Sequence, residues 1–185
     1  MTRCARCSLH DSACICGEVP VVATRTRILI VRHAAETAKP SNSGRLAALA
    51  LSNSALCNYG ARDTPFDATP LRAPRTWVLF GDGGSTSTPA GDPPAQLVVL
   101  DGTWTQARRM YQRIDALRGL PQLALPALAA SPDQLRTPPR PGALSTIQAI
   151  ARAVELLEGP DVAAPLDELY RLMIERSRAT ARRRP

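Results

Sequence analysis

Lysine and aromatic residues are scarce in this chain. Lys39 is the only lysine among 23 basic residues, so arginine carries nearly all of the positive charge behind the net charge of +7. Because a guanidinium makes paired hydrogen bonds with phosphates, this composition favours a polyanionic partner; a plain compositional bias toward Arg and Ala is the alternative. Aromatic residues make up only 4% of the chain. The core must therefore be largely aliphatic, and each tryptophan stands out.

Long apolar runs are also missing. No stretch approaches the roughly 18 to 20 apolar residues that a membrane span requires, so we expect no membrane partner. The start of the chain, Met1 to Cys7, contains no apolar signal segment, and we expect a cytoplasmic protein. Thiols stay reduced in that compartment, where paired cysteines indicate a metal site more often than a disulfide.

The length of 185 residues suits one ordinary domain. A chain of this size buries roughly 70% of the surface that it exposes when unfolded, so it needs no disulfides to fold. Residues 1–20 form a cysteine-rich head that ends at Pro20, and residues 21–185 form the main domain. A basic tail, Arg182 to Arg184, closes the sequence.

Four cysteines dominate the head. Cys4, Cys7, Cys14 and Cys16 have the spacing C-x2-C-x6-C-x-C. Four thiolates suit a tetrahedral zinc ion with no open coordination position, which predicts a structural site. Metal binding of this kind contributes on the order of 10 kcal/mol, enough to order a segment with little core of its own. The alternatives are His10 in place of one thiolate, an iron–sulfur cluster, and free or oxidised thiols.

The order of apolar segments predicts an α/β fold. Strands are expected at residues 26–31, 76–80, 96–100 and 121–125, and helices at residues 44–51, 104–117, 145–158 and 165–180. A short apolar run at residues 56–59 contains Cys57, which is most simply a core residue. Alternating strands and helices imply a mainly parallel sheet flanked by helices, and ligands of such sheets bind outside the carboxyl ends of the strands.

The junction after the strand at residues 96–100 carries the main catalytic candidates. It reads Asp101-Gly-Thr-Trp104 and leads into a helix. We expect Asp101 to be a general base or an electrostatic partner of the substrate, with a solvated turn residue as the alternative. Thr103 and Gln106 have the spacing of a capping box, so Thr103 either starts the helix or contacts ligand. Trp104 either stacks on a ligand ring or anchors the helix in the core.

Other polar residues gather near predicted strand and helix ends. His33 and Glu36 follow the first strand, with Asn42 and Arg45 shortly after, as expected of a loop that faces a site. Ser145 and Gln148 again have capping-box spacing, so either structure alone accounts for them or Ser145 and Thr146 contact a ligand. Basic candidates for phosphate contacts are Arg108, Arg109, Arg113, Arg176, Arg178 and Arg182 to Arg184. For those near the C-terminus, the alternative is a role at the helix dipole or in solvent.

Five motifs in a fixed order resemble the DTW-domain family. They are the four-cysteine head, Arg32-His33-Ala-Ala-Glu36 with Ser41 to Leu46 after it, Asp101-Gly-Thr-Trp104, Gln134-Leu-Arg136, and Leu144 to Ala149. The resemblance covers residues 4 to 158 and is far more specific than a lone Asp-x-Thr-Trp.

The resemblance implies both an activity and a fold. Family members of this kind are tRNA-uridine aminocarboxypropyltransferases, which move the 3-amino-3-carboxypropyl (acp) group of S-adenosylmethionine (SAM) to N3 of a tRNA uridine. The second product is 5'-methylthioadenosine. The implied fold is related to the knotted SPOUT methyltransferases.

The resemblance also implies roles for individual residues. Asp101, Thr103 and Trp104 are the catalytic candidates. The SAM-binding candidates are His33, Glu36, Phe80, Gly81, Leu100, Leu144, Ser145 and Thr146. The tRNA-binding candidates are Asn42, Arg45, Arg108, Arg109 and Arg136, of which Arg45 and Arg136 suit either a phosphate or the SAM carboxylate. The chain departs from the family at Gln148, where Glu is usual, and at Gly81 to Gly83, where many members have Pro.

Two rival functions stay open. A SPOUT-type SAM-dependent RNA methyltransferase would use the same pocket and release S-adenosylhomocysteine. A zinc-containing RNA-binding module without activity would depend on its arginines and not on Asp101. The oligomeric state is left open by the sequence.

Overall fold

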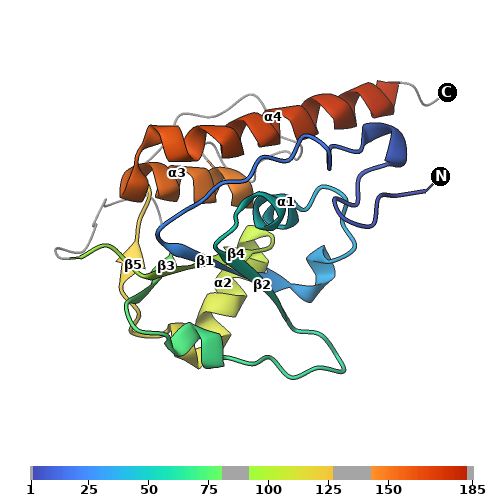
Figure 1. Cartoon of the computed structure of the whole chain (residues 1–185). Coiled ribbons are helices and arrows are strands. Elements are labelled where there is room, and N and C mark those ends of the chain that lie inside the picture. Colours follow the sequence, from blue (N-terminus) through green and yellow to red (C-terminus); the bar gives the residue numbers. More distant parts are fainter. Residues whose placement is uncertain (1, 81–91, 127–142, 183–185) are drawn as a thin grey trace.

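A five-stranded parallel sheet forms the centre of the protein (Figure 1). The computed structural model describes residues 2–80, 92–126 and 143–182. Along the chain the strands are β1 (Arg27–His33), β2 (Ser54–Tyr59), β3 (Thr76–Leu79), β4 (Gln96–Asp101) and β5 (Gln122–Leu123). Their order across the sheet is β2-β1-β4-β3-β5, and each neighbouring pair is parallel. The predicted α/β class with a mainly parallel sheet is confirmed.

Both faces of the sheet are apolar, because parallel sheets are covered by helices on both sides. In β1, Ile28 and Ile30 belong to one core cluster, whereas Leu29 and Val31 belong to another. The residues of β4 divide between the same two clusters. Since successive side chains of a strand point to opposite faces, the position of a residue in its strand determines the face to which it belongs.

Helices cover the two faces unequally (Figure 1). On the face of Ile28 and Ile30 lie α1 (Ser43–Ala50), α3 (Thr146–Glu158) and α4 (Pro160–Arg182), and we call this the α3 face. On the opposite face, called the α2 face, lie α2 (Trp104–Arg113) and the 3-10 turns η3 (Thr69–Arg72) and η4 (Asp115–Leu117).

The cysteine-rich head packs against α4 on the α3 face. Its residues Leu9 and Ile15 are buried in the same apolar cluster as the inner side of α4. A 3-10 turn of the head, η1 (Asp11–Ala13), contacts α4. Arg176 of α4 forms an ion pair with Glu18 at 2.8 Å. The head therefore shares the core of the main domain.

Most predicted elements are present, with strand ends moved by one or two residues. The apolar run around Cys57 belongs to β2, an edge strand, where this cysteine is partly buried. Two helix boundaries were wrong. α2 ends at Arg113 because Ile114 is extended and a separate turn follows. α4 begins at Pro160 rather than at Pro165, since proline is tolerated at the first helical position and α3 ends at a glycine with φ of 105°.

Among the described residues, no helix combines the length and the hydropathy that crossing a membrane demands.

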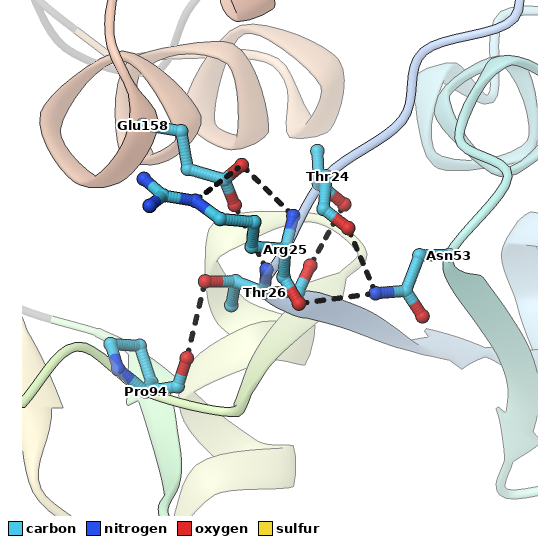
Figure 2. A network of polar contacts seen from close by, with 6 residues as sticks. All are labelled: Thr24, Arg25, Thr26, Asn53, Pro94 and Glu158. Atoms are coloured by element: carbon cyan, nitrogen blue, oxygen red, sulfur yellow. Dashed lines mark hydrogen bonds and ion pairs between the residues drawn. The ribbon is translucent and has the colours of Figure 1, made fainter.

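A network of polar contacts among Thr24, Arg25, Thr26, Asn53 and Glu158, which we call the clasp, holds the amino end of the sheet (Figure 2). Glu158, the last residue of α3, accepts hydrogen bonds from the backbone N–H groups of Arg25 and Thr26, both at 2.9 Å. It also pairs with Nε of Arg25 at 3.7 Å. Asn53, just before β2, donates to the carbonyl oxygens of Thr24 and Arg25 at 3.0 and 3.3 Å. The chain is thus held by α3 and by β2 as it enters β1.

We expect Glu158→Ala to lower the free energy of unfolding by about 1 to 3 kcal/mol, because backbone donors lose a charged acceptor. Urea denaturation followed by circular dichroism measures the change. Glu168→Ala removes an exposed carboxylate from α4 and is the matched control, with an expected change within about 0.5 kcal/mol. Equal stability of the two variants would show that the clasp does not hold β1.

Candidate active site

Polar residues from three neighbouring strands line up at the carboxyl edge of the sheet. Arg32 of β1 is in register with Asn58 of β2 on one side and with Asp101 of β4 on the other. Nε of Arg32 donates to Oδ1 of Asn58 at 2.9 Å. Because Arg32 follows the alternation of Ile28 and Ile30, this polar row points to the α3 face.

Asp101 lies at the centre of this edge. Its Oδ2 accepts a hydrogen bond from Nδ2 of Asn42 and its Oδ1 accepts one from Oγ1 of Thr146, each at 2.6 Å. The residue is only 3% exposed. The alternative of a solvated turn residue is therefore wrong, because side chains at the starts of two helices hold this carboxylate.

The N-termini of α1 and α3 converge on Asp101. Asn42 caps α1 by accepting the N–H of Arg45 at 2.9 Å, so one side chain serves both the helix and the carboxylate. Oγ of Ser43 accepts the N–H of Ile147 at 3.4 Å, which joins the two helix starts. The free N–H groups and the dipole of a helix start favour negative charge. Asp101 thus occupies an anion position shared by two helices.

Burial raises the pKa of Asp101 above the usual value for an aspartate, and the hydrogen bonds from Asn42 and Thr146 oppose this rise. Among nearby charges, Glu36 raises the pKa of Asp101 and Arg32 lowers it. The carboxyl group therefore binds a proton more readily than an exposed aspartate does. Such a group suits general acid–base chemistry.

Gly44 allows α1 to approach this carboxylate. A Cβ at residue 44 would lie 2.5 Å from Cγ and 2.6 Å from Oδ2 of Asp101. Those distances are far below van der Waals contact, so a larger residue must displace the carboxylate or the helix. The glycine in the Ser-Asn-Ser-Gly-Arg segment therefore has a steric reason that only the structure reveals.

A second acidic side chain is buried beside the edge. Glu36 ends the 3-10 turn η2 (Ala34–Glu36), is 1% exposed, and pairs with Nζ of Lys39 at 2.6 Å. His33 begins this turn, and its Nδ1 accepts the N–H of Ala35 at 3.2 Å. The loop after β1 therefore owes its shape to both of the residues that the sequence singled out there.

The start of α2 lies on the opposite face of the sheet. Oε1 of Gln106 accepts the N–H of Thr103 at 2.7 Å, and Oγ1 of Thr103 accepts the N–H of Gln106 at 3.3 Å. The predicted capping box is confirmed. Trp104 is 42% exposed, so the alternative that it anchors the helix in the core is wrong. Met110 is the residue of α2 that fills the core on this face.

Phe80, which follows β3, stacks on Tyr111 of α2. The ring centroids are 4.0 Å apart and the planes differ by 6°. The hydroxyl of Tyr111 accepts a hydrogen bond from Nε2 of Gln122 at 2.6 Å. One face of the Phe80 ring is therefore covered by protein, and no ligand ring can stack on that face.

A family profile for the DTW domain matches residues 1–178. The chain belongs to the DTW-domain family. It is 29% identical over 167 residues to tRNA-uridine aminocarboxypropyltransferase 2 of Drosophila melanogaster, which covers 84% of the chain and 66% of that protein. Its identity to the protein of the same name from Mus musculus is 27% over 168 residues, which covers 84% of the chain and 56% of that protein.

This DTW domain thus spans 56% to 66% of the length of these relatives. Among solved structures it is similar to the SAM-dependent rRNA:acp-transferase Tsr3 from Vulcanisaeta distributa, with a TM-score of 0.53 and 19% identity. The likeness covers 86% of the chain and 80% of that structure. At this level of identity it shows a shared fold.

The predicted site residues of the DTW domain divide between the two faces of the sheet. Asp101, Asn42 and Thr146 contact one another on the α3 face. Arg45 follows Asn42 in the first turn of α1 on the same face. Residues on or next to the α2 face are His33, Phe80, Leu100, Thr103 and Trp104. The carboxyl edge is the place where the two groups come nearest.

The remaining predicted site residues lie on α2, at the start of α3 or outside the described part of the chain. Arg108, Arg109 and Arg113 are exposed on α2, as expected. Oε1 of Gln148 accepts from the N–H and the hydroxyl of Ser145, at 3.1 and 2.8 Å, which confirms the structural explanation of their spacing. Residues outside the described part are Gly81, Arg136, Arg183 and Arg184. Leu144 directly precedes Ser145 and is partly buried.

The site also contains residues to which the sequence assigned no role. Arg32, Ser43 and Gly44 all lie at the carboxyl edge, and Lys39 pairs with Glu36 beside it. Arg32 could have been recognised from the sequence, because a charged residue directly after the buried apolar run of β1 requires a partner.

The four head cysteines of the DTW domain converge on one point. Their Sγ atoms all lie within 4.8 Å of one another. Cys4 and Cys16 are 3.5 Å apart, and Cys7 and Cys14 are 3.9 Å apart. His10 is not among the metal-ligating side chains that converge in the described structure. Its Nδ1 contacts a serine hydroxyl at 2.7 Å. The geometry therefore favours four thiolates over a set that includes the histidine.

Gly44→Ala should destabilise the protein by about 1 to 3 kcal/mol, although alanine is the better helix former, because the added Cβ overpacks against Asp101. Thermal denaturation measures the loss. Gly17→Ala is the control, since nothing lies within 4 Å of the Cβ position there. A Gly44→Ala variant as stable as the control would contradict the close approach of α1 to the carboxylate.

Proposed function

We propose that this DTW domain transfers the acp group of SAM to N3 of a tRNA uridine and releases 5'-methylthioadenosine. The observation that carries the proposal is the Asp101 carboxyl, buried where two helix starts meet the end of β4. The names of the relatives state acp transfer to tRNA uridine, and that of the similar structure states SAM-dependent acp transfer.

The order of the strands supports a ligand site next to Asp101. From β1 the chain passes through α1 on the α3 face to β2, at one edge of the sheet. From β4 it passes through α2 on the opposite face to β5, at the other edge. Ligands of open parallel sheets bind where connections part in this way. That place is the carboxyl end of β1 and β4, where Arg32 and Asp101 are paired.

The reaction needs a base and the alignment of two substrates. The sulfonium of SAM makes sulfur a good leaving group, and the acp carbon bound to sulfur is the electrophile. N3 of uracil carries a proton and becomes a nucleophile as this proton leaves. Alignment supplies roughly 7 to 11 kcal/mol, and a general base contributes about 10²- to 10⁴-fold.

Asp101 is the base in this proposal, and Thr146 connects it to N3. Asp101 is buried, whereas Thr146 is partly exposed and donates its hydroxyl proton to the carboxylate. The hydroxyl accepts the N3 proton as its own proton passes to Asp101. The raised pKa makes this carboxylate a better proton acceptor than an exposed aspartate. The alternative role of Asp101 is to hold the sulfonium or the amino group of SAM.

The two substrates are assigned to different surfaces. SAM occupies the carboxyl edge, with contacts from His33, Glu36, Phe80, Leu100, Leu144, Ser145 and Thr146. The tRNA lies over the exposed side of α2, where Arg108, Arg109 and Arg113 bind phosphates and Trp104 stacks on a base, and the target uridine reaches Thr146 across the carboxyl edge. Affinity from such phosphate contacts falls steeply with salt.

The knotted, SPOUT-like topology and the cytoplasmic location are further parts of the proposal. The chain between β5 and α3 runs through residues 127–142, which lie outside the described part. We also propose that residues 1–20 form a metal-binding unit attached to a catalytic domain.

The head cysteines fit a structural zinc ion. At a Zn–S distance of about 2.3 Å, a tetrahedron places its sulfur atoms about 3.8 Å apart. The distances of 3.5 Å for Cys4–Cys16 and 3.9 Å for Cys7–Cys14 lie on either side of this value. A bound ion would order the head and hold Leu9 and Ile15 in the core next to α4.

Incubation with SAM and unmodified tRNA, followed by nucleoside mass spectrometry, tests the function. We expect acp-uridine and 5'-methylthioadenosine as products. Asp101→Asn should reduce the rate by at least about 100-fold, because the amide cannot accept the proton. Asp115→Asn, at an exposed carboxylate of η4, is the matched control and should not change the rate.

The pH dependence of the reaction rate tests the role of Asp101 as the base. Only the ionised carboxylate accepts a proton, so the wild-type rate should increase as pH rises through the raised pKa of Asp101. The residual rate of Asp101→Asn should lack this increase. Methylated uridine with S-adenosylhomocysteine would instead establish the methyltransferase alternative, and tRNA binding without any product would establish the RNA-binding module.

Elemental analysis should find one zinc ion per chain, and Cys4→Ser should lose the ion together with thermal stability. Cys57→Ser on β2 is the control, because this cysteine is not among the four converging thiols. Full zinc occupancy in Cys4→Ser, or none in the wild-type protein purified without chelators, would contradict the zinc assignment.

A further inference from the structure

One arginine nitrogen beside the active edge is buried without an acceptor. Arg45 lies in the first turn of α1, and its Nη2 donates to the carbonyl oxygen of Thr37. Its Nη1 is shielded from solvent but has no hydrogen-bond partner among the described residues. A buried charged donor without an acceptor is unfavourable. An oxygen atom of a bound ligand would accept a hydrogen bond from this Nη1.

Arg32 is the second cation at this place, which we call the corner and which consists of Arg32, Glu36, Lys39, Arg45 and Asp101. It is 6% exposed, and its Nε is held by Asn58. Arg32 is in register with Asp101, and the Asp101 carboxylate touches Gly44, the residue before Arg45, so both arginines belong to the surroundings of one carboxylate. Burial lowers the pKa of Arg32, and the charge of Arg45 lowers it further. Like charges that are close together and poorly hydrated favour an anion between them.

Among the described residues around Asp101, the cations Arg32, Lys39 and Arg45 outnumber the carboxylates of Asp101 and Glu36. Lys39 and Glu36 form an ion pair and together add no net charge. Arg32 and Arg45 carry one positive charge each, against at most one negative charge on Asp101. A ligand carboxylate at the two guanidinium groups would offset part of this positive charge.

We propose that Arg45 and Arg32 bind the carboxylate of the methionine moiety of SAM, which belongs to the group that is transferred. This inference rests on the proposed function and adds a donor subsite to it. A guanidinium fork matches the two oxygens of a carboxylate. Arg32 and Asp101 are buried and Arg45 is partly buried, which suits a small carboxylate, whereas the exposed arginines of α2 suit the phosphates of RNA.

Such a subsite explains which carbon of the sulfonium reacts. With the carboxylate held at Arg45 and the N3 proton received at Asp101, the acp carbon is presented to the nucleophile. The N3–carbon bond forms as the carbon–sulfur bond breaks, and its electron pair stays on sulfur, which leaves as the neutral thioether of methylthioadenosine. The methyl group of SAM has no charged group by which the site could orient it.

Calorimetric titration without tRNA tests the subsite with three ligands. SAM and S-adenosylhomocysteine carry the carboxylate, and 5'-methylthioadenosine lacks it. We expect Arg45→Gln to weaken binding of the first two about 10- to 100-fold and to leave the affinity for methylthioadenosine unchanged. Arg45→Lys keeps the charge but loses the paired hydrogen bonds, so its affinities should fall between those of the wild type and Arg45→Gln.

Arg109→Gln is the matched control, because it makes the same change at an exposed arginine of α2. It should weaken tRNA binding and leave all three donor-side affinities unchanged.

Three results would count against the assignment or the function. Equal loss of methylthioadenosine affinity in Arg45→Gln would overturn the subsite, since the pocket itself would be damaged. Unchanged SAM affinity with weaker, less salt-dependent tRNA binding would overturn it in favour of a phosphate site. A wild-type chain that binds SAM but forms no acp-uridine would overturn the proposed function and leave the subsite standing.

Discussion

The carboxylate of Asp101 determines how the active edge of this protein is assembled. Its oxygens accept hydrogen bonds from Asn42 and Thr146, which are 59 and 45 positions away in the chain. These buried groups are satisfied only when β4, α1 and α3 are all in place, and a buried polar group left unsatisfied costs about 1 to 3 kcal/mol. Gly44 makes the close approach possible. The proposed base is therefore a group that the fold itself requires.

α3 is fastened to the sheet at both of its ends. Thr146 at its start binds Asp101 at the carboxyl edge, and Glu158 at its end binds the backbone that enters β1 at the amino edge. Because the strands are parallel, these two anchors lie at opposite edges of the sheet. The helix cannot slide along the strands without breaking one of them. The corner around Asp101 therefore has a fixed wall, which favours preorganised binding.

Many elements could be predicted from the sequence because buried strands are apolar runs and helix starts carry capping residues such as Thr103. The face of each side chain could not be predicted. Asp101 and Trp104 are close in sequence, but the strand residue points to the α3 face and the helix that follows crosses to the other. Arg32 was missed because its partners Asn58 and Asp101 become neighbours only through the strand order β2-β1-β4. The end of α2 could not be predicted either, because the helix stops where the backbone of Ile114 becomes extended.

The scarcity of lysine has a chemical consequence for this edge. Acylation of a lysine side chain within this sequence has a single target, and Lys39 combines 42% exposure with a 2.6 Å contact to Glu36, whose side chain is 1% exposed. An acyl group on Nζ would remove a cation that pairs with a carboxylate almost without access to water, and the loss of one charged partner from a buried group is costly. An amine-directed reagent, or an acetylating enzyme, could thus alter the electrostatics of the interior by touching one surface atom.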